Sequence, residues 1–227
     1  MLREPPPDEA RLALDRAVVE AVRARLAAGP RETPDADAIA LRAALAGLSP
    51  AEAAAARAVL GRIDAAEGPP LVVWGTASQV LAADRYGLVA RLAARPETAL
   101  QAVRDGGRAL MDLAPASAWW GRLLAEPALR IVAALPDHGA GPPRALLVRK
   151  AAPGPTGDDR TFWATDSALP DGRIVAALGE AGLAAEPLLA AGGLKLFVLA
   201  GYVQAEDGRL ASAPGDLTGV IGAAPVF

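Results

Sequence analysis

The sequence predicts an α+β fold built from three parts: a short three-helix bundle (residues 1–67), a small central α/β unit (68–157) and a βαββαβ unit (158–227). The order of hydrophobic patterns supports this division. Helical patterns come first, strands and helices then alternate, and after residue 160 the pattern is strand, helix, strand, strand, helix, strand. The stretch 152–159 contains two prolines, two glycines and two aspartates, which oppose both helix and sheet and predict an exposed connection.

Three helices are predicted in the first part. The first, over 8–28, can be capped by Asp8, and its inward face is defined by +4, +3 and +4 spacing at Leu14, Val18, Ala21 and Arg25. A short helix follows at 38–46. The third begins at Ser49-Pro50, where serine can cap and proline suits the first turn, and ends near residue 66. Because these helices are rich in alanine, each buries little area, so we expect them to dock onto the next part or to dimerise.

The remaining elements follow from apolar runs separated by glycine and proline. In the central part we predict helices at 76–86, 96–104 and 118–124, and strands at 71–74, 88–92, 109–113, 129–135 and 145–148. This alternation favours a mainly parallel sheet. In the last part we predict helices at 172–181 and 207–213, and strands at 161–165, 184–190, 194–203 and 217–222.

Three local features leave a choice between a structural and a ligand-binding role. Gly75-Thr76, at a strand-to-helix turn, can present backbone N–H groups to an anion, although most such turns are only structural. Trp119-Trp120 is typical of core or interface packing, with stacking on a ligand as the alternative. Arg25, on the apolar face of its helix, either extends its head to solvent or faces an anionic ligand inside the bundle.

Composition excludes several classes of protein. The net charge of −3 argues against a nucleic-acid-binding surface, which needs clustered basic charge. Cysteine is absent and His138 is the lone histidine, so we expect no disulfide, no metal site and no cofactor. No apolar run is long enough for a membrane span, and the first residues lack a signal-peptide core. We therefore expect a soluble, cytoplasmic protein with no nucleic-acid or membrane partner.

The usual signatures of chemistry are absent from the sequence. It contains no nucleophile–histidine signature, no phosphate-binding Gly-x-x-x-x-Gly-Lys and no dinucleotide fingerprint. If the chain is an enzyme, its reaction should depend on positioning and charge more than on an acid, base or nucleophile. The pericyclic rearrangement of a dicarboxylate is one such reaction.

Several segments resemble a known family, in the same order along the chain. They are Gly68-Pro69 into Val72-Val73, Ala82 to Gly87, Ala118-Trp119-Trp120, Leu129 to Val132, Thr156 to Arg160, and Gly201-Tyr202-Val203 through Val220-Ile221-Gly222. Together with the helices at 8–67, they resemble a bacterial chorismate mutase that carries a prephenate-dehydratase-like lobe and an ACT-like unit. The resemblance implies aromatic amino-acid biosynthesis, conversion of chorismate to prephenate, and a homodimer.

Carried over by position, the mutase site is depleted. The family's Asp and its carboxylate-binding Arg match Asp15 and Arg25, and Arg11 lies one turn beyond the place of the Arg expected from a partner subunit. Glu67 stands where the family has Gln and could serve only when protonated. The family's Lys has no counterpart, since residues 1–149 contain no lysine; Arg57 is a possible substitute. Losing that charge would cost several kcal/mol in rate, by analogy with oxyanion-hole deletions.

The other two sites implied by the resemblance are also incomplete. The ACT-like unit has Ala168 to Gly172 and Ala185 to Pro187 where the family has its phenylalanine-binding motifs. The dehydratase family ends in Thr-Arg-Phe with a catalytic Thr, whereas this chain has Arg160-Thr161-Phe162, which places Thr161 one position late.

Two functions therefore remain open. One is a weak or inactive chorismate mutase using Arg25, Arg11 and Glu67. The other is a non-catalytic relative on the same scaffold, a small-molecule-binding or regulatory and interaction module that uses the groove near Gly75-Thr76 or the ACT-like sheet. For either function the expected ligand is a small chorismate- or prephenate-like anion.

Overall fold

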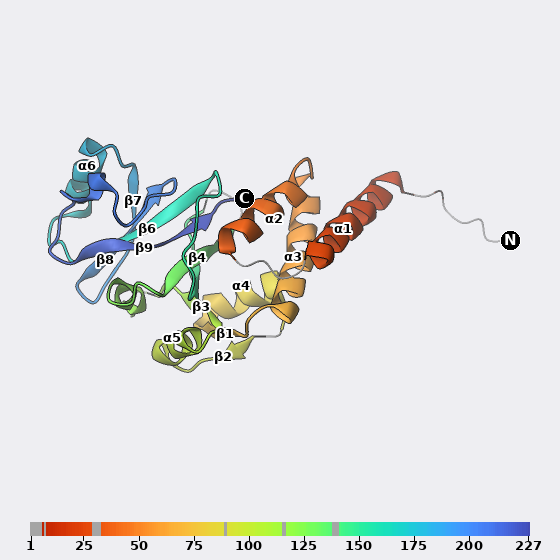
Figure 1. Cartoon of the computed structure of the whole chain (residues 1–227), viewed down its shortest axis with the longest axis horizontal. Helices are drawn as coiled ribbons and strands as arrows, with labels where there is room; N and C mark the ends of the chain where they lie inside the picture. Colours follow the sequence, from red (N-terminus) through yellow and green to blue (C-terminus); the bar gives the residue numbers. More distant parts are fainter. Residues whose placement is uncertain (1–5, 7, 29–32, 89, 115–116, 138–140) are drawn as a thin grey trace.

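The computed structural model describes residues 6, 8–28, 33–88, 90–114, 117–137 and 141–227. Three N-terminal helices are followed by one mixed sheet of nine strands (Figure 1). The chain is therefore mixed α/β with a helical N-terminal part, which agrees with the coarse prediction. Within the described ranges, no helix is long and apolar enough to cross a membrane.

The described residues form six α-helices, two 3₁₀ turns and nine strands. The helical elements are α1 (Glu9–Ala28), α2 (Pro34–Leu45), α3 (Pro50–Glu67), α4 (Thr76–Tyr86), α5 (Pro96–Arg104), the 3₁₀ turn η1 (Trp119–Leu124), α6 (Asp171–Glu180) and the 3₁₀ turn η2 (Gly208–Leu210). The strands are β1 (Leu71–Trp74), β2 (Arg91–Leu92), β3 (Arg108–Asp112), β4 (Arg130–Leu135), β5 (Ala145–Arg149), β6 (Asp159–Thr165), β7 (Ala185–Ala191), β8 (Leu194–Ala200) and β9 (Thr218–Pro225).

The strands lie in the order β2-β1-β3-β5-β4-β9-β6-β8-β7. The pairs β1–β2, β1–β3 and β4–β9 are parallel, and the other five pairs are antiparallel. The prediction of a mainly parallel sheet for the central part is therefore wrong. The reason is that β4 and β5 form an antiparallel pair, and β5 then inserts between β3 and β4, where it runs against both.

One sheet spans the predicted boundary between residues 157 and 158. The last strand, β9, returns to lie between β4 and β6, so it joins the two halves of the chain. Gly222 makes this possible: it has φ +147°, and a Cβ there would overlap the backbone of Ile131 on β4. Only glycine takes this backbone conformation without strain.

Apolar side chains cover both faces of the sheet. On one face, α5 and η1 pack with the inward residues of β3, β4 and β5, and Trp119 and Trp120 are buried there, which confirms their predicted role in packing. On the opposite face lies α4, with Ala82 and Tyr86 against β1, β3 and β5. Farther along the sheet, α6 packs Ile174 and Leu178 on β6 and β8.

The first three helices have no hydrophobic core of their own. Among the described residues of α1 to α3, the buried ones are Pro34, Ala38, Ala56, Arg57, Leu60 and Gly61. Helix α3 contacts α1, α2 and α4, so it connects this layer to the sheet. At Gly61 the α3 backbone comes so close to α4 that a Cβ would overlap the Arg85 carbonyl oxygen. The helices therefore dock onto the α/β part, as their alanine content suggested.

Several predicted elements differ from the observed ones: the strand predicted at 194–203 ends at Ala200, and the strand predicted at 217–222 continues to Pro225. Helix α2 starts at Pro34 instead of 38, since proline is tolerated in a first helical turn. The strand predicted over 88–92 is only Arg91–Leu92, and its apolar Leu88 is 94% exposed. The helix predicted at 207–213 is the single turn η2, where the Asp207 side chain accepts from the Arg209 N–H and Pro214 follows shortly afterwards.

Candidate functional site

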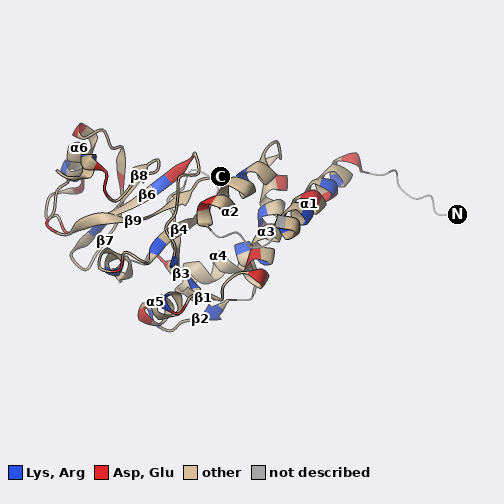
Figure 2. Cartoon of the chain, viewed as in Figure 1, with Lys and Arg blue, Asp and Glu red and all other residues tan. Residues whose placement is uncertain are grey.

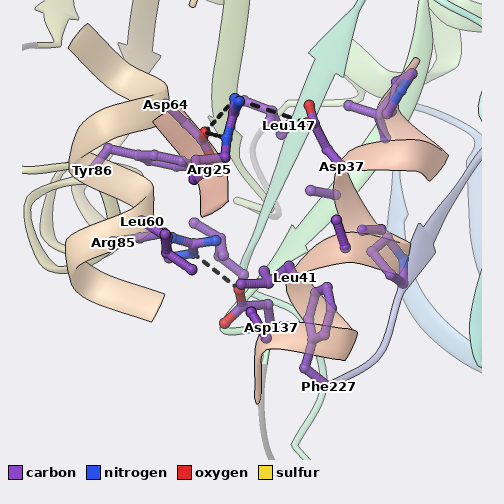
Figure 3. A pocket seen from close by; sticks show the side chains of 18 of the residues that line it. Arg25, Asp37, Leu41, Leu60, Asp64, Arg85, Tyr86, Asp137, Leu147 and Phe227 are labelled. Carbon is purple, nitrogen blue, oxygen red and sulfur yellow. Dashed lines mark hydrogen bonds and ion pairs between the residues drawn. The ribbon is translucent and has the colours of Figure 1, made fainter. Parts of the chain in front are cut away.

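A cavity of about 140 Å³ lies between the helical layer and the sheet. That volume is about ten times what one water molecule needs. Helices α1, α2 and α3 form one wall, the end of α4 another, and β3, β4 and β5 the floor; residues after β9 close one side (Figure 3). The apolar lining comes from Leu41, Leu60, Tyr86, Val132, Leu135, Leu147 and Phe227, together with several alanines.

Arg42 holds helix α2 in place over this cavity. Its Nη2 donates to the carbonyl oxygens of Asp158 and Val226, both at 3.0 Å, and Nη1 donates to the Thr156 carbonyl. Its guanidinium also lies 5.5 Å from the centre of the Phe227 ring. The wall formed by α2 is therefore tied to the β5–β6 connection and to the residues beyond β9.

Arg25 enters the cavity from α1 but is paired with carboxylates. Its Nη2 lies 2.8 Å from Asp64 Oδ1 on α3, and its Nε donates to the same oxygen at 2.9 Å. Asp37 Oδ1 on α2 is 3.9 Å from Nη2. Figure 3 shows Arg25 between these two aspartates. The arginine thus joins three helices and neither extends into solvent nor stands open to a ligand.

A second ion-paired group lies at the other end of the cavity. Arg85 Nε donates to Asp137 Oδ2 at 3.1 Å, and its Nη1 donates to the carbonyl of Arg57. Arg57 Nε is 4.0 Å from Asp137 Oδ1, and these three side chains are at most 10% exposed. Two arginines therefore share one buried carboxylate, which leaves this end with a net positive charge.

Arg108 on β3 is a cavity cation that forms no ion pair with a carboxylate of the described residues. Its Nη2 donates to the Asp64 carbonyl at 2.7 Å, and its guanidinium lies 5.4 Å from the centre of the Tyr86 ring. Its Nε is buried and has no hydrogen-bond partner among the described residues. Burial lowers the pKa of Arg108, because removing water disfavours the charged form. An unsatisfied N–H of a buried cation costs free energy unless an acceptor is supplied.

Arg149 on β5 adds a second unpaired cation beside it. The register places Arg149 directly opposite Arg108 on β3 and Arg130 on β4, so three arginines form a row across neighbouring strands. Like charges directly opposite one another destabilise a sheet. Arg130 donates to the Val220 carbonyl and does not line the cavity. The Arg149 side chain lines it and makes no hydrogen bond or ion pair within the described part of the chain.

The sequence-predicted site residues are only partly brought together. Arg25 and Glu67 both line a smaller, adjoining cavity of about 70 Å³ that also contacts Arg108 and Arg149. Arg57 is buried at Asp137 and lines a neighbouring hollow of about 230 Å³ that shares Arg85, Leu135 and Asp137 with the cavity. Arg11 is exposed on α1 and lines neither cavity. The catalytic roles given to these residues remain predictions.

The two other predicted contacts lie away from the cavity and have protein partners. At the Gly75-Thr76 turn, Asp112 Oδ2 accepts from the Ala77 N–H at 3.0 Å, so a protein carboxylate lies at the start of α4. Thr161 is fully buried; its hydroxyl donates to the Gly201 carbonyl at 2.8 Å and accepts from the Val203 N–H at 2.9 Å. None of Gly75, Thr76 and Thr161 lines the cavity between the helical layer and the sheet, and their binding roles remain predictions.

Tyr86 makes the free energy of unfolding depend on alkaline pH. Burial raises its pKa, an effect that Arg85 and Arg108 partly offset, so the unfolded chain ionises before the folded one. From about pH 9 to about pH 11, unfolding should become easier, by up to ~1.4 kcal/mol per pH unit from this group. Tyr86→Phe should remove this contribution, as measured by urea titrations across the range.

Tyr202→Phe is the matched control for this measurement. Burial also raises the pKa of Tyr202, but its hydroxyl donates to the Pro153 carbonyl, and the group is more exposed than Tyr86. We expect Tyr202→Phe to change the slope less than Tyr86→Phe does. Equal slopes in the wild type and Tyr86→Phe would contradict the assignment of the raised pKa to Tyr86.

Comparison with known proteins gives little for this chain. No family model and no curated protein matches it. A solved structure described as "GqqA- a novel type of quorum quenching acylases" is similar over 69% of this chain and 95% of its own, with 17% sequence identity and a TM-score of 0.45. A similarity of this size transfers no activity to this chain.

The predicted membership of the chorismate mutase family is wrong. No family model supports it, and the match that was found names a different class of protein. The structure shows a physical reason why the pattern misled. Arg25, which was matched to a substrate anchor, is paired with Asp64 and Asp37, and α1 to α3 depend on the sheet for burial. Helical spacing of charged residues occurs in many docked helices and does not by itself define a site.

Proposed function

We propose that this protein binds a small organic anion, a carboxylate attached to an apolar body, in the cavity between the helical layer and the sheet. The observation that carries the proposal is the adjacent pair Arg108 and Arg149. One has a buried Nε without an acceptor and the other has no partner among the described residues, and both line the cavity. This is the binding function that the sequence left open beside catalysis.

The charge balance of the cavity supports an anionic ligand. Four arginines line it (Arg25, Arg85, Arg108 and Arg149) against three aspartates (Asp37, Asp64 and Asp137). Asp37 and Asp64 are both engaged by Arg25, and Asp137 is shared by Arg85 and Arg57. The lining therefore carries one more positive than negative charge, and Arg108 and Arg149 are the lining cations that form no ion pair among the described residues. A guanidinium presents N–H donors in a fork that matches the two oxygens of a carboxylate.

The rest of the lining supports an apolar body on that ligand. Tyr86 and Phe227 present aromatic rings, and the remaining surface is mostly aliphatic. Mostly apolar walls with a few convergent polar groups are typical of small-molecule sites. The described lining residues include no serine, cysteine or histidine, so no activated nucleophile is at hand. Binding without chemistry is the simpler function, and rearrangement of chorismate rested on a family resemblance that does not hold.

Titration with small carboxylates tests the proposal. Benzoate, phenylacetate and hexanoate are added to the purified full chain and heat is measured by calorimetry, with benzamide as the neutral analogue of benzoate. At least one carboxylate should bind and benzamide should not. Arg149→Gln should weaken that binding by about tenfold or more, because a hydrogen bond to a charged group contributes ~1.5–3 kcal/mol.

Arg130→Gln is the matched control, since Arg130 stands directly opposite Arg149 but does not line the cavity. It should leave affinity within about twofold of the wild type. Arg149→Gln should also leave the ligand-free protein as stable as the wild type, or more so, because it relieves repulsion in the arginine row. The proposal fails if no carboxylate binds, or if Arg130→Gln and Arg149→Gln weaken binding equally.

A further inference from the structure

Helix α1 presents an apolar stripe that nothing in the described chain covers. No described side chain of this 20-residue helix is buried, and in Figure 1 it extends away from the rest of the chain toward the N-terminus. Leu12, Val19 and Leu26 are 44%, 45% and 51% exposed. They follow one another at seven-residue intervals, so they lie on one face.

This stripe is separate from the face that α1 uses within the chain. The partly covered residues of α1 include Leu14, Val18, Ala21 and Arg25, which share the face toward α3 and the cavity. At 100° per residue, the centre of the exposed stripe is more than a third of a turn away from that face. Helices in water owe most of their stability to packing of an apolar face, so two apolar faces indicate two partners.

The charges around the stripe are arranged symmetrically. Asp15 and Arg23 each lie four residues from Val19, and Leu12 and Leu26 lie seven residues from it. Counted outward from Val19, the spacing is therefore the same in both directions: a charged residue at four positions and a leucine at seven. The charge is negative on the N-terminal side and positive on the C-terminal side. Asp15 and Arg23 are exposed, and neither forms an ion pair with a residue that the structure describes.

We propose that α1 pairs in antiparallel fashion with α1 of a second copy of the chain, around a twofold axis through Val19. In that arrangement Val19 packs on Val19 of the partner, and each Leu12 packs against the other copy's Leu26. Each Asp15 comes level with Arg23 of the other copy, so the charges on the two sides are complementary. A twofold interface uses the same patch on both partners and therefore needs a self-complementary pattern.

The same features argue against other occupants of the stripe. A helix that lies on a membrane is usually strongly basic on its polar face, whereas α1 carries both signs along its length (Figure 2). Binding to an unrelated partner protein would not require the pattern on α1 to be symmetric about Val19. The pairing also has a consequence for the cavity, because α1 contributes Ala21, Ala24 and Arg25 to its wall. Holding α1 in a dimer would fix that wall.

Sedimentation equilibrium of the full chain, over about a hundredfold range of concentration, tests the pairing. We expect a dimer for the wild type. Val19→Arg should raise the dissociation constant of the dimer about tenfold or more, since the two added cations would meet at the twofold axis. Ala13→Arg adds the same group at an exposed position of the same helix outside the stripe and should leave the dimer intact.

A charge exchange separates this pairing from other modes of dimerisation. Asp15→Arg alone places like charges level across the axis and should weaken the dimer, whereas Asp15→Arg combined with Arg23→Asp should restore it. Circular dichroism of each variant shows whether the helices are retained. A monomeric wild type, a Val19→Arg variant that dimerises as tightly as the wild type, or a double variant without rescue would each overturn the proposal. Binding of a monomer to anionic vesicles would assign the stripe to a membrane surface instead.

Discussion

Gly61→Ala should lower the free energy of unfolding by about 1–2 kcal/mol, although the change normally favours a helix. Gly61 lies inside α3, where alanine is preferred over glycine by ~1 kcal/mol. Here the new Cβ would overlap the Arg85 carbonyl oxygen, which belongs to the backbone of α4 and cannot move by a simple side-chain rotation. The two helices must separate, and overpacking of this kind costs ~1–3 kcal/mol or more. Urea unfolding followed by tryptophan fluorescence measures the change.

Gly179→Ala is the control for this experiment. Gly179 is also inside a helix, α6, but a Cβ there meets nothing within 4 Å. This variant should gain stability by up to ~1 kcal/mol from helix propensity alone. Opposite signs for the two substitutions would show that the α3–α4 approach is as close as described. A gain in stability for Gly61→Ala would contradict that approach.

The same substitution should also weaken ligand binding. Helix α3 contributes Leu60 and Asp64 to the cavity, and α4 contributes Arg85 and Tyr86. Separating the two helices therefore displaces groups on two walls at once. Carboxylate affinity of folded Gly61→Ala protein should fall, while that of Gly179→Ala should remain at the wild-type value.

Local sequence signals predicted most helices and strands correctly. The start of α3 is an example: Ser49 accepts from the Glu52 N–H, and the Glu52 carboxylate accepts from the Ser49 N–H, as the capping pattern predicted. Sheet order was not predictable in this way. The insertion of β5 between β3 and β4, and of β9 between β4 and β6, depends on contacts between residues far apart in the chain. Hydrophobic periodicity indicates that a strand exists but not which strand it pairs with.

The candidate site was found only in part, for a similar reason. Arg25 stood out because it interrupts an apolar helical face, and it does line the cavity. Arg108 and Arg149 were missed because each occupies the end of a strand, where a single arginine is usually solvated. Their significance comes from register, which places them directly opposite each other. Basic residues that flank apolar runs can be picked out from the sequence, so Arg108 and Arg149 could have been candidates. The sequence does not show that they are paired.

The register of β3, β4 and β5 also explains why the cavity contains arginines that no carboxylate neutralises among the described residues. Within the helical layer, cations and carboxylates are matched across helices, as Arg25 is with Asp64 and Asp37. On the sheet, Arg108, Arg149 and Arg130 stand in a row, and no interstrand carboxylate neutralises that row within the described residues. An arrangement that costs stability in the free protein persists where a ligand offsets the cost. The side chains that cost stability are thus the ones to which we assign ligand binding.

Asp137→Asn should destabilise the protein by about 3 kcal/mol. The Asp137 carboxylate is 9% exposed and is the acceptor for Arg85 and the near neighbour of Arg57, which are themselves almost fully buried. Replacing it with a neutral amide of the same shape leaves two buried cations without a counter-charge. Breaking a buried pair from one side costs ~3–5 kcal/mol, because the remaining charge is neither hydrated nor paired. The change is measured by urea unfolding at neutral pH.

Glu97→Gln tests whether burial causes this effect. Glu97 pairs with Arg122 at 3.1 Å, the same separation as Asp137 and Arg85, but the two side chains are about half exposed. Water already hydrates both groups, so this substitution should cost at most ~1 kcal/mol. The comparison holds distance and chemistry nearly constant and changes only the surroundings. Equal losses for the two variants would mean that Asp137 is hydrated in solution, and that the cavity end formed by Arg85 and Arg57 is open to water.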